Sequence, residues 1–308
     1  MPPAPLSPGA RSPGALSRRA FLGSALGAAG GLVVAGSLAD MVWADVAGAA
    51  TSTPNPKTYF PLVLSSDLAA SPQAQRLVFA LSHSTKNGIQ YASGPSVTAR
   101  FRKQGGQWGQ PLKTAFDRAG LPKGRGVYVA QPVLDSAGIW QVEARAQGQK
   151  VPFTIQVADA PTVIVPGQAA PRDASPTTTD TLGVDPICTR EPMCPLHTQS
   201  LSTVIGAGKP VAALFATPAR CQSQYCAPVL DEFLSTIKAY GDQIVPVHIE
   251  IYQKSTGTAL VPTVDAWHLP SEPWLFGISG DGTVQSRIDG AFGGTEMKAL
   301  LDALVKPQ

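Results

Sequence analysis

The residues of this chain best suited to chemistry are its four cysteines, which all lie between positions 188 and 226 of a 308-residue sequence: Cys188, Cys194, Cys221 and Cys226. Thiols so placed can exchange electrons through disulfides, stabilise the fold as structural disulfides, or bind a soft metal ion. Four cysteines allow three ways of forming two disulfides, and their spacing alone does not select one of them.

The second pair, Cys221 and Cys226, lies where an apolar run ends and a helical pattern begins. A cysteine at a helix N-terminus faces unpaired backbone N–H groups and the positive end of the helix dipole, which stabilise a thiolate. We therefore predict that Cys221 is the exposed attacking sulfur and Cys226 its less exposed resolving partner. Arg220 is expected to lower the pKa of the Cys221 thiol further. Five positions on a continuous helix would separate the two Cα atoms by about 8 Å, too far for a disulfide, so Cys221 must precede the helix.

The first pair, Cys188 and Cys194, encloses a short loop that contains a proline. Such a loop favours a structural disulfide that closes it where the chain enters the second half of the protein. Two alternatives stay open. Cys188, Cys194 and His197, together with Met193, offer ligands that suit copper(I), or the first pair passes electrons to the second.

The elements that must position these cysteines are predicted by apolar periodicity. Continuous apolar runs indicate buried strands, and apolar residues spaced three or four apart indicate an amphipathic helix. An Asp-Gly turn between two apolar runs indicates a hairpin. The predicted order is a short helix, a strand, a helix, a strand, a hairpin and a helix, at residues 201–206, 210–215, 225–240, 244–251, 274–288 and around 300–304.

This order, with a cysteine pair between the strand and its helix and a proline before the hairpin, resembles the thioredoxin superfamily over residues 183–306. The resemblance implies an α/β thioredoxin-like fold with thiol-disulfide exchange as its activity. It assigns Pro273, which follows Glu272, to the place of the family's cis-proline facing the redox cysteines.

The second pair also departs from the thioredoxin pattern. Four residues separate its cysteines where the family usually has two, and the strand ends in Leu214 and Phe215 where thioredoxins often bury an acid. The four-residue spacing resembles that of some peroxiredoxins. Those enzymes carry a threonine three residues before the reactive cysteine, a position that Pro218 occupies here, so peroxidase activity ranks below thiol exchange.

The first half of the chain has the pattern of strands. Over residues 57–159 apolar and polar residues alternate, and the two runs on either side of Gly148 predict a β-hairpin. The turn and aromatic strand at 135–142 resemble the signature of immunoglobulin-like sandwiches. We expect an all-β sandwich that binds, spaces or orients, because its histidine, His83, has no partner at metal-ligand spacing. The Pro- and Thr-rich residues 160–182 predict a semi-extended linker.

The N-terminus has the features of an export signal. Arg18 and Arg19, followed by Phe21 and an uncharged stretch rich in Gly and Ala, resemble a twin-arginine signal. The stretch is only weakly apolar, which favours a cleaved signal over a transmembrane anchor. We place the signal at residues 1–44, with cleavage between positions 44 and 49. The destination is extracytoplasmic, where disulfides persist.

Composition limits the choice of partners. A formal net charge of +3, 15% charged residues and the lack of a Lys/Arg run argue against nucleic-acid binding and against a charge-rich disordered chain. We predict an exported thiol-disulfide oxidoreductase that acts on protein thiols and disulfides of the cell envelope without a cofactor. The alternative from another class is a non-catalytic binding or scaffold protein with structural disulfides, with or without bound copper.

Overall fold

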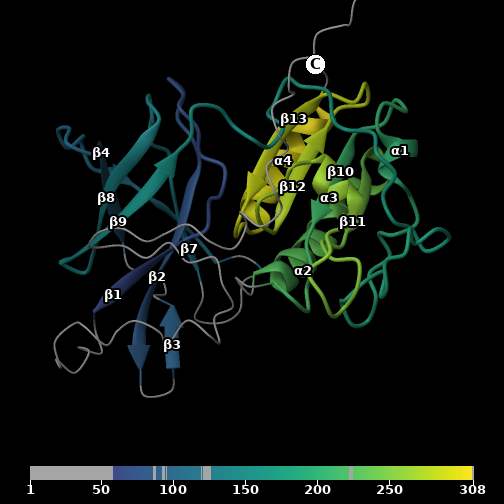
Figure 1. Cartoon of the computed structure of the whole chain (residues 1–308), viewed down its shortest axis with the longest axis horizontal. Coiled ribbons are helices and arrows are strands. Elements are labelled where there is room, and N and C mark those ends of the chain that lie inside the picture. The colour runs from purple at the N-terminus through teal and green to yellow at the C-terminus, as the bar shows by residue number, and fades with distance from the viewer. Residues whose placement is uncertain are drawn as a thin grey trace, which may run out of the picture. The chain divides into compact units, whose positions relative to one another are not determined.

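The computed structural model describes residues 58–85, 88–91, 94, 96–118, 120, 126–221 and 225–306. The described residues form three β-sheets and several helices (Figure 1). The export signal predicted for residues 1–44 lies outside this part of the chain. None of the helices described is both long enough and apolar enough to cross a lipid bilayer.

The N-terminal half contains two antiparallel sheets. The first has the order β1 (Tyr59–Val63), β2 (Leu77–Thr85), β7 (Val127–Ala130) and β6 (Ala115–Asp117), with β3 (Gly88–Tyr91) also paired to β2. The second has the order β5 (Leu112–Lys113), β4 (Val97–Lys103), β8 (Gly138–Ala146) and β9 (Gln149–Val157).

These two sheets share one core, to which alternate residues along their longer strands contribute. On β9, for example, Val151 and Phe153 are buried while Pro152 between them is exposed. Phe153 packs against Phe79 of the other sheet, with 5.3 Å between ring centroids. The predicted hairpin around Gly148 is confirmed as β8 and β9. The immunoglobulin-like assignment stays a prediction.

The C-terminal half is built on a four-stranded sheet with the order β11 (Val245–Ile249), β10 (Val211–Phe215), β12 (Trp274–Ile278) and β13 (Val284–Asp289). The β10 and β11 strands are parallel, and the other two pairings are antiparallel. The strands and the hairpin predicted for this half are therefore present, in the order expected of a thioredoxin-like α/β fold.

Helices cover both faces of this sheet. The helices α2 (Cys226–Thr236) and α4 (Gly294–Val305) contribute to the core on one face, whereas α1 (Leu201–Val204) and α3 (Pro262–Ala266) contribute to the core on the other. The central strand β10 lies between these two cores. Leu214 packs into the first core and Phe215 into the second, so both faces of the strand are covered and all its residues are buried. The predicted helix at 225–240 continues beyond α2 as the 3-10 helix η2 (Ile237–Gln243).

The segment 160–182, predicted as a linker, forms neither a helix nor a strand, but it is packed on the C-terminal sheet. The backbone of Gly167 donates a hydrogen bond to the carbonyl of Val284 at 2.8 Å, and the Val284 N–H donates to the Gln168 carbonyl at 2.9 Å. Val163 and Ala170 are buried in the core beneath it. The segment therefore belongs structurally to the C-terminal half and is not a free spacer.

Candidate active site

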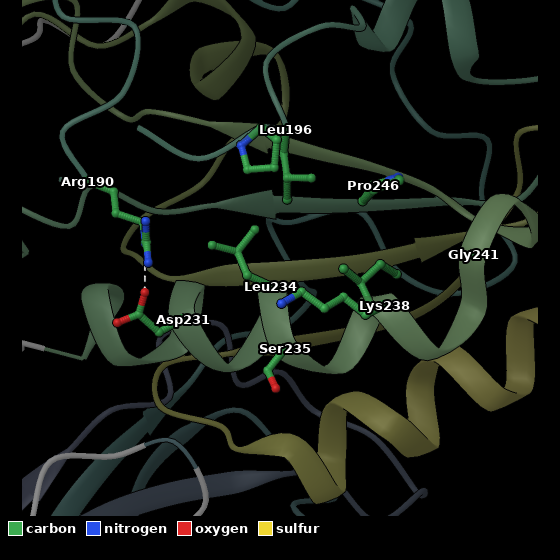
Figure 2. Close-up of a pocket in the computed structure, with 10 residues that line it drawn as sticks. Arg190, Leu196, Asp231, Leu234, Ser235, Lys238, Gly241 and Pro246 are labelled. Carbon is green, nitrogen blue, oxygen red and sulfur yellow. Dashed lines mark hydrogen bonds and ion pairs between the residues drawn. The ribbon is translucent and has the colours of Figure 1, made fainter. Parts of the chain in front are cut away.

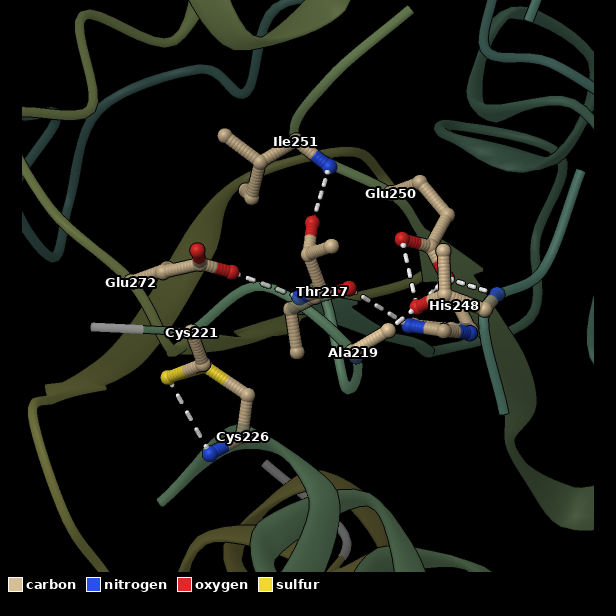
Figure 3. Close-up of a disulfide and its surroundings, with 10 residues drawn as sticks. Thr217, Ala219, Cys221, Cys226, His248, Glu250, Ile251 and Glu272 are labelled. Carbon is tan, nitrogen blue, oxygen red and sulfur yellow. Dashed lines mark hydrogen bonds between the residues drawn. A yellow bond between two sulfur atoms is a disulfide. The ribbon is translucent and has the colours of Figure 1, made fainter. Parts of the chain in front are cut away.

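A disulfide between Cys221 and Cys226 lies between the end of β10 and the first residue of α2 (Figure 3). The two Cα atoms are 5.8 Å apart, which is possible because Cys221 precedes the helix, as predicted. The backbone N–H of Cys226 donates a hydrogen bond to the Cys221 sulfur at 3.3 Å. The Cys221 sulfur therefore lies at the positive end of α2, the position that stabilises a thiolate once the disulfide is reduced.

The exposure of the two cysteines differs from the prediction in part. Cys226 is fully buried, as expected of a resolving cysteine. Cys221 is only 9% exposed, so the expectation of an exposed attacking sulfur is wrong for the disulfide state. The physical reason is packing, since Cys221 joins the same core as Leu214 and Val229. A substrate must therefore reach a sulfur that is largely covered.

Glu272 places a carboxyl group beside the disulfide. One of its oxygens and both sulfur atoms lie within 4.8 Å of one another. Its Oε2 atom accepts a hydrogen bond from the Thr217 backbone N–H at 2.5 Å, while Oε1 is buried and has no hydrogen-bond partner among the described residues. Burial raises the pKa of Glu272 to about 7, against the lowering effect of the Thr217 bond. A carboxyl with this pKa can exchange a proton with a thiol near neutral pH.

The peptide bond between Glu272 and Pro273 is cis, as the resemblance implied. Pro273 immediately precedes β12. The same short segment before this strand therefore carries both the acid and the cis-proline. Thioredoxins often bury an acid at the end of the strand before the cysteines, but β10 ends in Leu214 and Phe215, and the role of Glu272 was not predicted from the sequence. The sequence feature that could have indicated it is the position of this acid directly before Pro273, the proline that the resemblance assigns to the site.

Glu250, the residue directly after β11, is a second buried acid of this region that was not predicted from the sequence. Its carboxyl accepts a hydrogen bond from the Thr189 backbone N–H at 2.7 Å. Burial raises its pKa to about 8, although this bond and others from Thr189 and Thr217 lower it. Its signal in the sequence was a charged residue inside the otherwise apolar run 244–251.

Arg220 lies against the loop that follows β11. Its guanidinium donates hydrogen bonds to the carbonyl oxygens of Lys254 at 2.9 Å and Gly257 at 2.5 Å, and it lies 4.3 Å from the centre of the Tyr252 ring. Its positive charge lowers the pKa of Glu272. Arg220 thus lowers the pKa of the neighbouring acid and holds the loop, and its effect on the pKa of the Cys221 thiol stays a prediction.

The first cysteine pair does not form the predicted structural disulfide. Cys188 and Cys194 are both free thiols, and they lie in a buried cluster with His197 and His248. The physical reason is tertiary packing, which brings a ring nitrogen of each imidazole to 3.3 Å from the Cys194 sulfur. Met193 is 53% exposed and does not belong to the cluster. A hydrogen bond from the Cys194 thiol is the main cause that lowers the pKa of Cys188 and raises that of Cys194.

His248 is the member of this cluster that sequence reasoning missed. It lies on β11, inside a run that reads as a plain buried strand. Burial lowers its pKa and favours the neutral imidazole. The only sequence signal was a histidine in an apolar strand, which by itself does not specify a partner.

Two pockets border α2. The larger, about 530 Å³, runs between α2, η2 and the segment before Leu196, and Figure 2 shows the ion pair of Arg190 and Asp231 at one end of it, 2.7 Å apart. The smaller, about 230 Å³, is lined by residues that include Pro218, Ala219 and Ala227. Ala219 and Ala227 are near neighbours in sequence of the two disulfide cysteines, so this smaller pocket borders the segments that carry the disulfide.

No protein-family model matches the chain, and no curated protein matches its sequence. A thioredoxin-family thiol:disulfide interchange protein from Chlorobium tepidum TLS aligns over 46% of this chain and 99% of its own, with 14% identity and a TM-score of 0.31. A candidate thiol:disulfide interchange protein DsbE from Chlorobium tepidum aligns over 47% of this chain and 100% of its own, with 17% identity and a TM-score of 0.31. These similarities are too weak to indicate an activity, so the function has to be inferred from the residues of the site.

Proposed function

We propose that this chain is an exported thiol-disulfide oxidoreductase that acts on protein thiols and disulfides of the cell envelope. One observation carries the proposal: the Cys221–Cys226 disulfide lies at the N-terminus of α2 with the Glu272 carboxyl beside it, and Glu272 is joined by a cis peptide bond to Pro273. This arrangement provides a stabilised thiolate, a resolving thiol and a proton acceptor in one place.

The proposed exchange conserves electrons between the protein and its substrate. In the reduced protein, the Cys221 thiolate attacks one sulfur of a substrate disulfide and forms a mixed disulfide, and the other substrate sulfur leaves as a thiolate. Cys226 then loses its proton and attacks the Cys221 sulfur. The second substrate sulfur leaves, the substrate is reduced by two electrons, and the Cys221–Cys226 disulfide is restored. The same steps in reverse oxidise a substrate dithiol.

Glu272 is the group that supports the proton transfer. Cys226 is fully buried, so its thiol needs a nearby base before it can attack. The carboxyl of Glu272 is near enough, and with a pKa of about 7 it is partly ionised at neutral pH. Pro273 and the backbone beside it would align the substrate chain, as the resemblance to thioredoxins implies.

The low exposure of Cys221 favours a second candidate, a non-catalytic binding or scaffold protein in which this disulfide is structural. The two candidates predict different reduction potentials. A structural disulfide typically lies below about −300 mV, whereas an exchanging disulfide lies above that value. The N-terminal half would serve either protein as a binding or spacing domain of immunoglobulin-like type.

The test combines this potential with a trapping experiment on the full chain. The Cys221/Cys226 potential is measured in glutathione buffers, and the Cys226→Ser variant, once reduced, is mixed with a peptide that contains one disulfide. We expect a potential above about −300 mV and a mixed disulfide on Cys221 that mass spectrometry locates. The matched Cys221→Ser variant should trap nothing. A potential below that range together with no trapped peptide would exclude the oxidoreductase.

Export is tested separately. The paired Arg18→Lys and Arg19→Lys substitutions should retain the chain in the cytoplasm when it is expressed in a bacterium with twin-arginine export, because the route reads the arginine pair. Fractionation with antibody detection measures the outcome. Unchanged export of the double variant would show that another signal directs the protein.

A further inference from the structure

Four metal-ligating side chains meet in a buried cluster separate from the disulfide: Cys188, Cys194, His197 and His248. One ligand atom of each lies within 4.8 Å of those of the others. The Cys194 sulfur is 3.3 Å from Nε2 of His197 and 3.3 Å from Nδ1 of His248. The two imidazole nitrogens are 3.1 Å apart. Four soft or borderline donors thus converge on one point in the protein interior.

Two distant parts of the chain supply these ligands. Cys188, Cys194 and His197 come from the irregular segment before α1, whereas His248 comes from β11. The backbone joins the two parts, because the His248 N–H donates a hydrogen bond to the Leu196 carbonyl at 3.1 Å. The sheet therefore fixes the position of His248, and the hydrogen bond to Leu196 holds the segment with the other three ligands against it.

The hydrogen bonding of His248 directs one ring nitrogen toward the cluster. Its Nε2 lies 2.9 Å from the carbonyl oxygen of Ala216. A carbonyl oxygen only accepts, so Nε2 carries the hydrogen and Nδ1 presents its lone pair to Cys194 and His197. A histidine that donates its second N–H to a backbone carbonyl while the first nitrogen faces other ligands is the usual arrangement around a bound metal.

Hydrogen bonds alone do not explain the cluster well. Nδ1 of His248 has a single lone pair, yet two polar atoms, the Cys194 sulfur and Nε2 of His197, lie within 3.3 Å of it. A cation at the centre would use the lone pairs of all four groups at once. Zinc bonds of about 2.3 Å to sulfur and about 2.0 to 2.1 Å to nitrogen put tetrahedral ligands about 3.3 to 3.8 Å apart, close to the separations seen here.

We propose that Cys188, Cys194, His197 and His248 bind one Zn²⁺ ion in a closed tetrahedral structural site. Two cysteines and two histidines form a frequent ligand set of structural zinc, and their burial leaves no open position for a substrate. Binding replaces the two thiol protons, which pass to solvent, and the two thiolates neutralise the ion. The competing states of the same residues are a Cys188–Cys194 disulfide and a copper(I) site.

The first test measures the metal content of the full chain. Protein purified without chelators, or reduced and incubated with ZnCl₂, should hold one zinc per chain by elemental analysis. Replacement with Co²⁺ should give the intense visible absorption bands of a tetrahedral site with thiolate ligands. Digestion without reduction, followed by mass spectrometry, shows whether Cys188 and Cys194 are joined. A chain that carries that disulfide and takes up no zinc even after reduction would overturn the proposal, and so would uptake of copper(I) but not zinc.

Substitutions at His248 test whether this residue binds zinc or only packs in the core. His248→Gln should lose the zinc, and His248→Cys should retain it, because a thiolate can replace the imidazole as ligand but cannot reproduce its hydrogen bond to Ala216. His268→Gln, at an exposed histidine of the same half, is the matched control and should keep full zinc content. The Cys221→Ser/Cys226→Ser double variant should also keep it, which separates this test from the proposed redox function. Equal zinc content in His248→Gln and the control would contradict the assignment.

Discussion

The backbone N–H of Thr217 donates a hydrogen bond to the Glu272 carboxyl at 2.5 Å and so joins the end of β10 to the residue before the cis-proline. The Thr217 hydroxyl also accepts a hydrogen bond from the Ile251 N–H at 2.9 Å, which ties in the chain just after β11. One residue therefore holds the ends of three neighbouring strands together next to the disulfide. The acid of the site is fixed by the fold before any substrate arrives.

Glu272→Gln should slow thiol exchange by about 100-fold at pH 7, because it removes the proton acceptor and leaves an amide of the same shape. In the wild type, the rate of the resolving step should rise with pH through about 7 as the carboxyl ionises. That rise should be absent in the variant. Stopped-flow kinetics with a disulfide peptide measure both effects. Glu143→Gln, in the N-terminal half, is the matched control, and a pH profile unchanged by Glu272→Gln would rule out this role.

Arg220→Gln should move the pH dependence of exchange to higher pH. Burial is the main cause that raises the pKa of Glu272, and the Arg220 charge opposes it, so removing the charge raises the pKa further. The midpoint of the rate profile should therefore lie above that of the wild type, which the same kinetics would detect. Arg102→Gln, which changes an arginine of β4, should leave the midpoint in place. A fixed midpoint in Arg220→Gln would mean that Arg220 acts only on the loop it contacts.

Glu250 should make the protein less stable as pH rises. Its pKa is about 8 in the folded protein and near 4.5 when unfolded, so between these values the folded state binds more protons than the unfolded state. The free energy of unfolding should therefore be highest below about pH 4.5, as far as this group is concerned, and fall until about pH 8.

Urea unfolding at pH 5.5 and pH 8.5 measures this effect. Glu250→Gln should show a smaller loss of stability between the two pH values than the wild type, by at most a few kcal/mol. Some pH dependence should remain, because Glu272 and Asp289 also have raised pKa values. The Glu143→Gln control should keep the full wild-type dependence. If Glu250→Gln behaves like that control, the Glu250 carboxyl does not titrate as described.

Sequence patterns predicted those features of the fold that depend on residues close together in the chain. Alternation along β9 and the turn at Gly148 were sufficient for the hairpin, since buried and exposed positions follow the period of a strand. The place of Cys221 before the helix followed from the length that a disulfide can span. These features depend on residues that are close together in sequence.

The composition of the two sites could not be predicted in the same way. His248 joins Cys194 and His197 because β11 lies beside the segment before α1, and no local pattern encodes that contact. Sequence proximity favoured a disulfide between Cys188 and Cys194, although tertiary packing places two imidazoles against the thiols. The burial of Cys221 likewise depends on core residues from other elements.

Thr189 connects the two cysteine pairs through hydrogen bonds. It follows Cys188 directly, its N–H donates to Glu250, and its hydroxyl accepts the N–H of Ala219, two residues before Cys221. A change in the backbone at Cys188 is thus transmitted to the Cys221 loop through a single residue. The effects of substitutions at Cys188 and Cys221 on the free energy of unfolding should therefore not add, so the two pairs are coupled in stability although the chemistry of each uses its own residues.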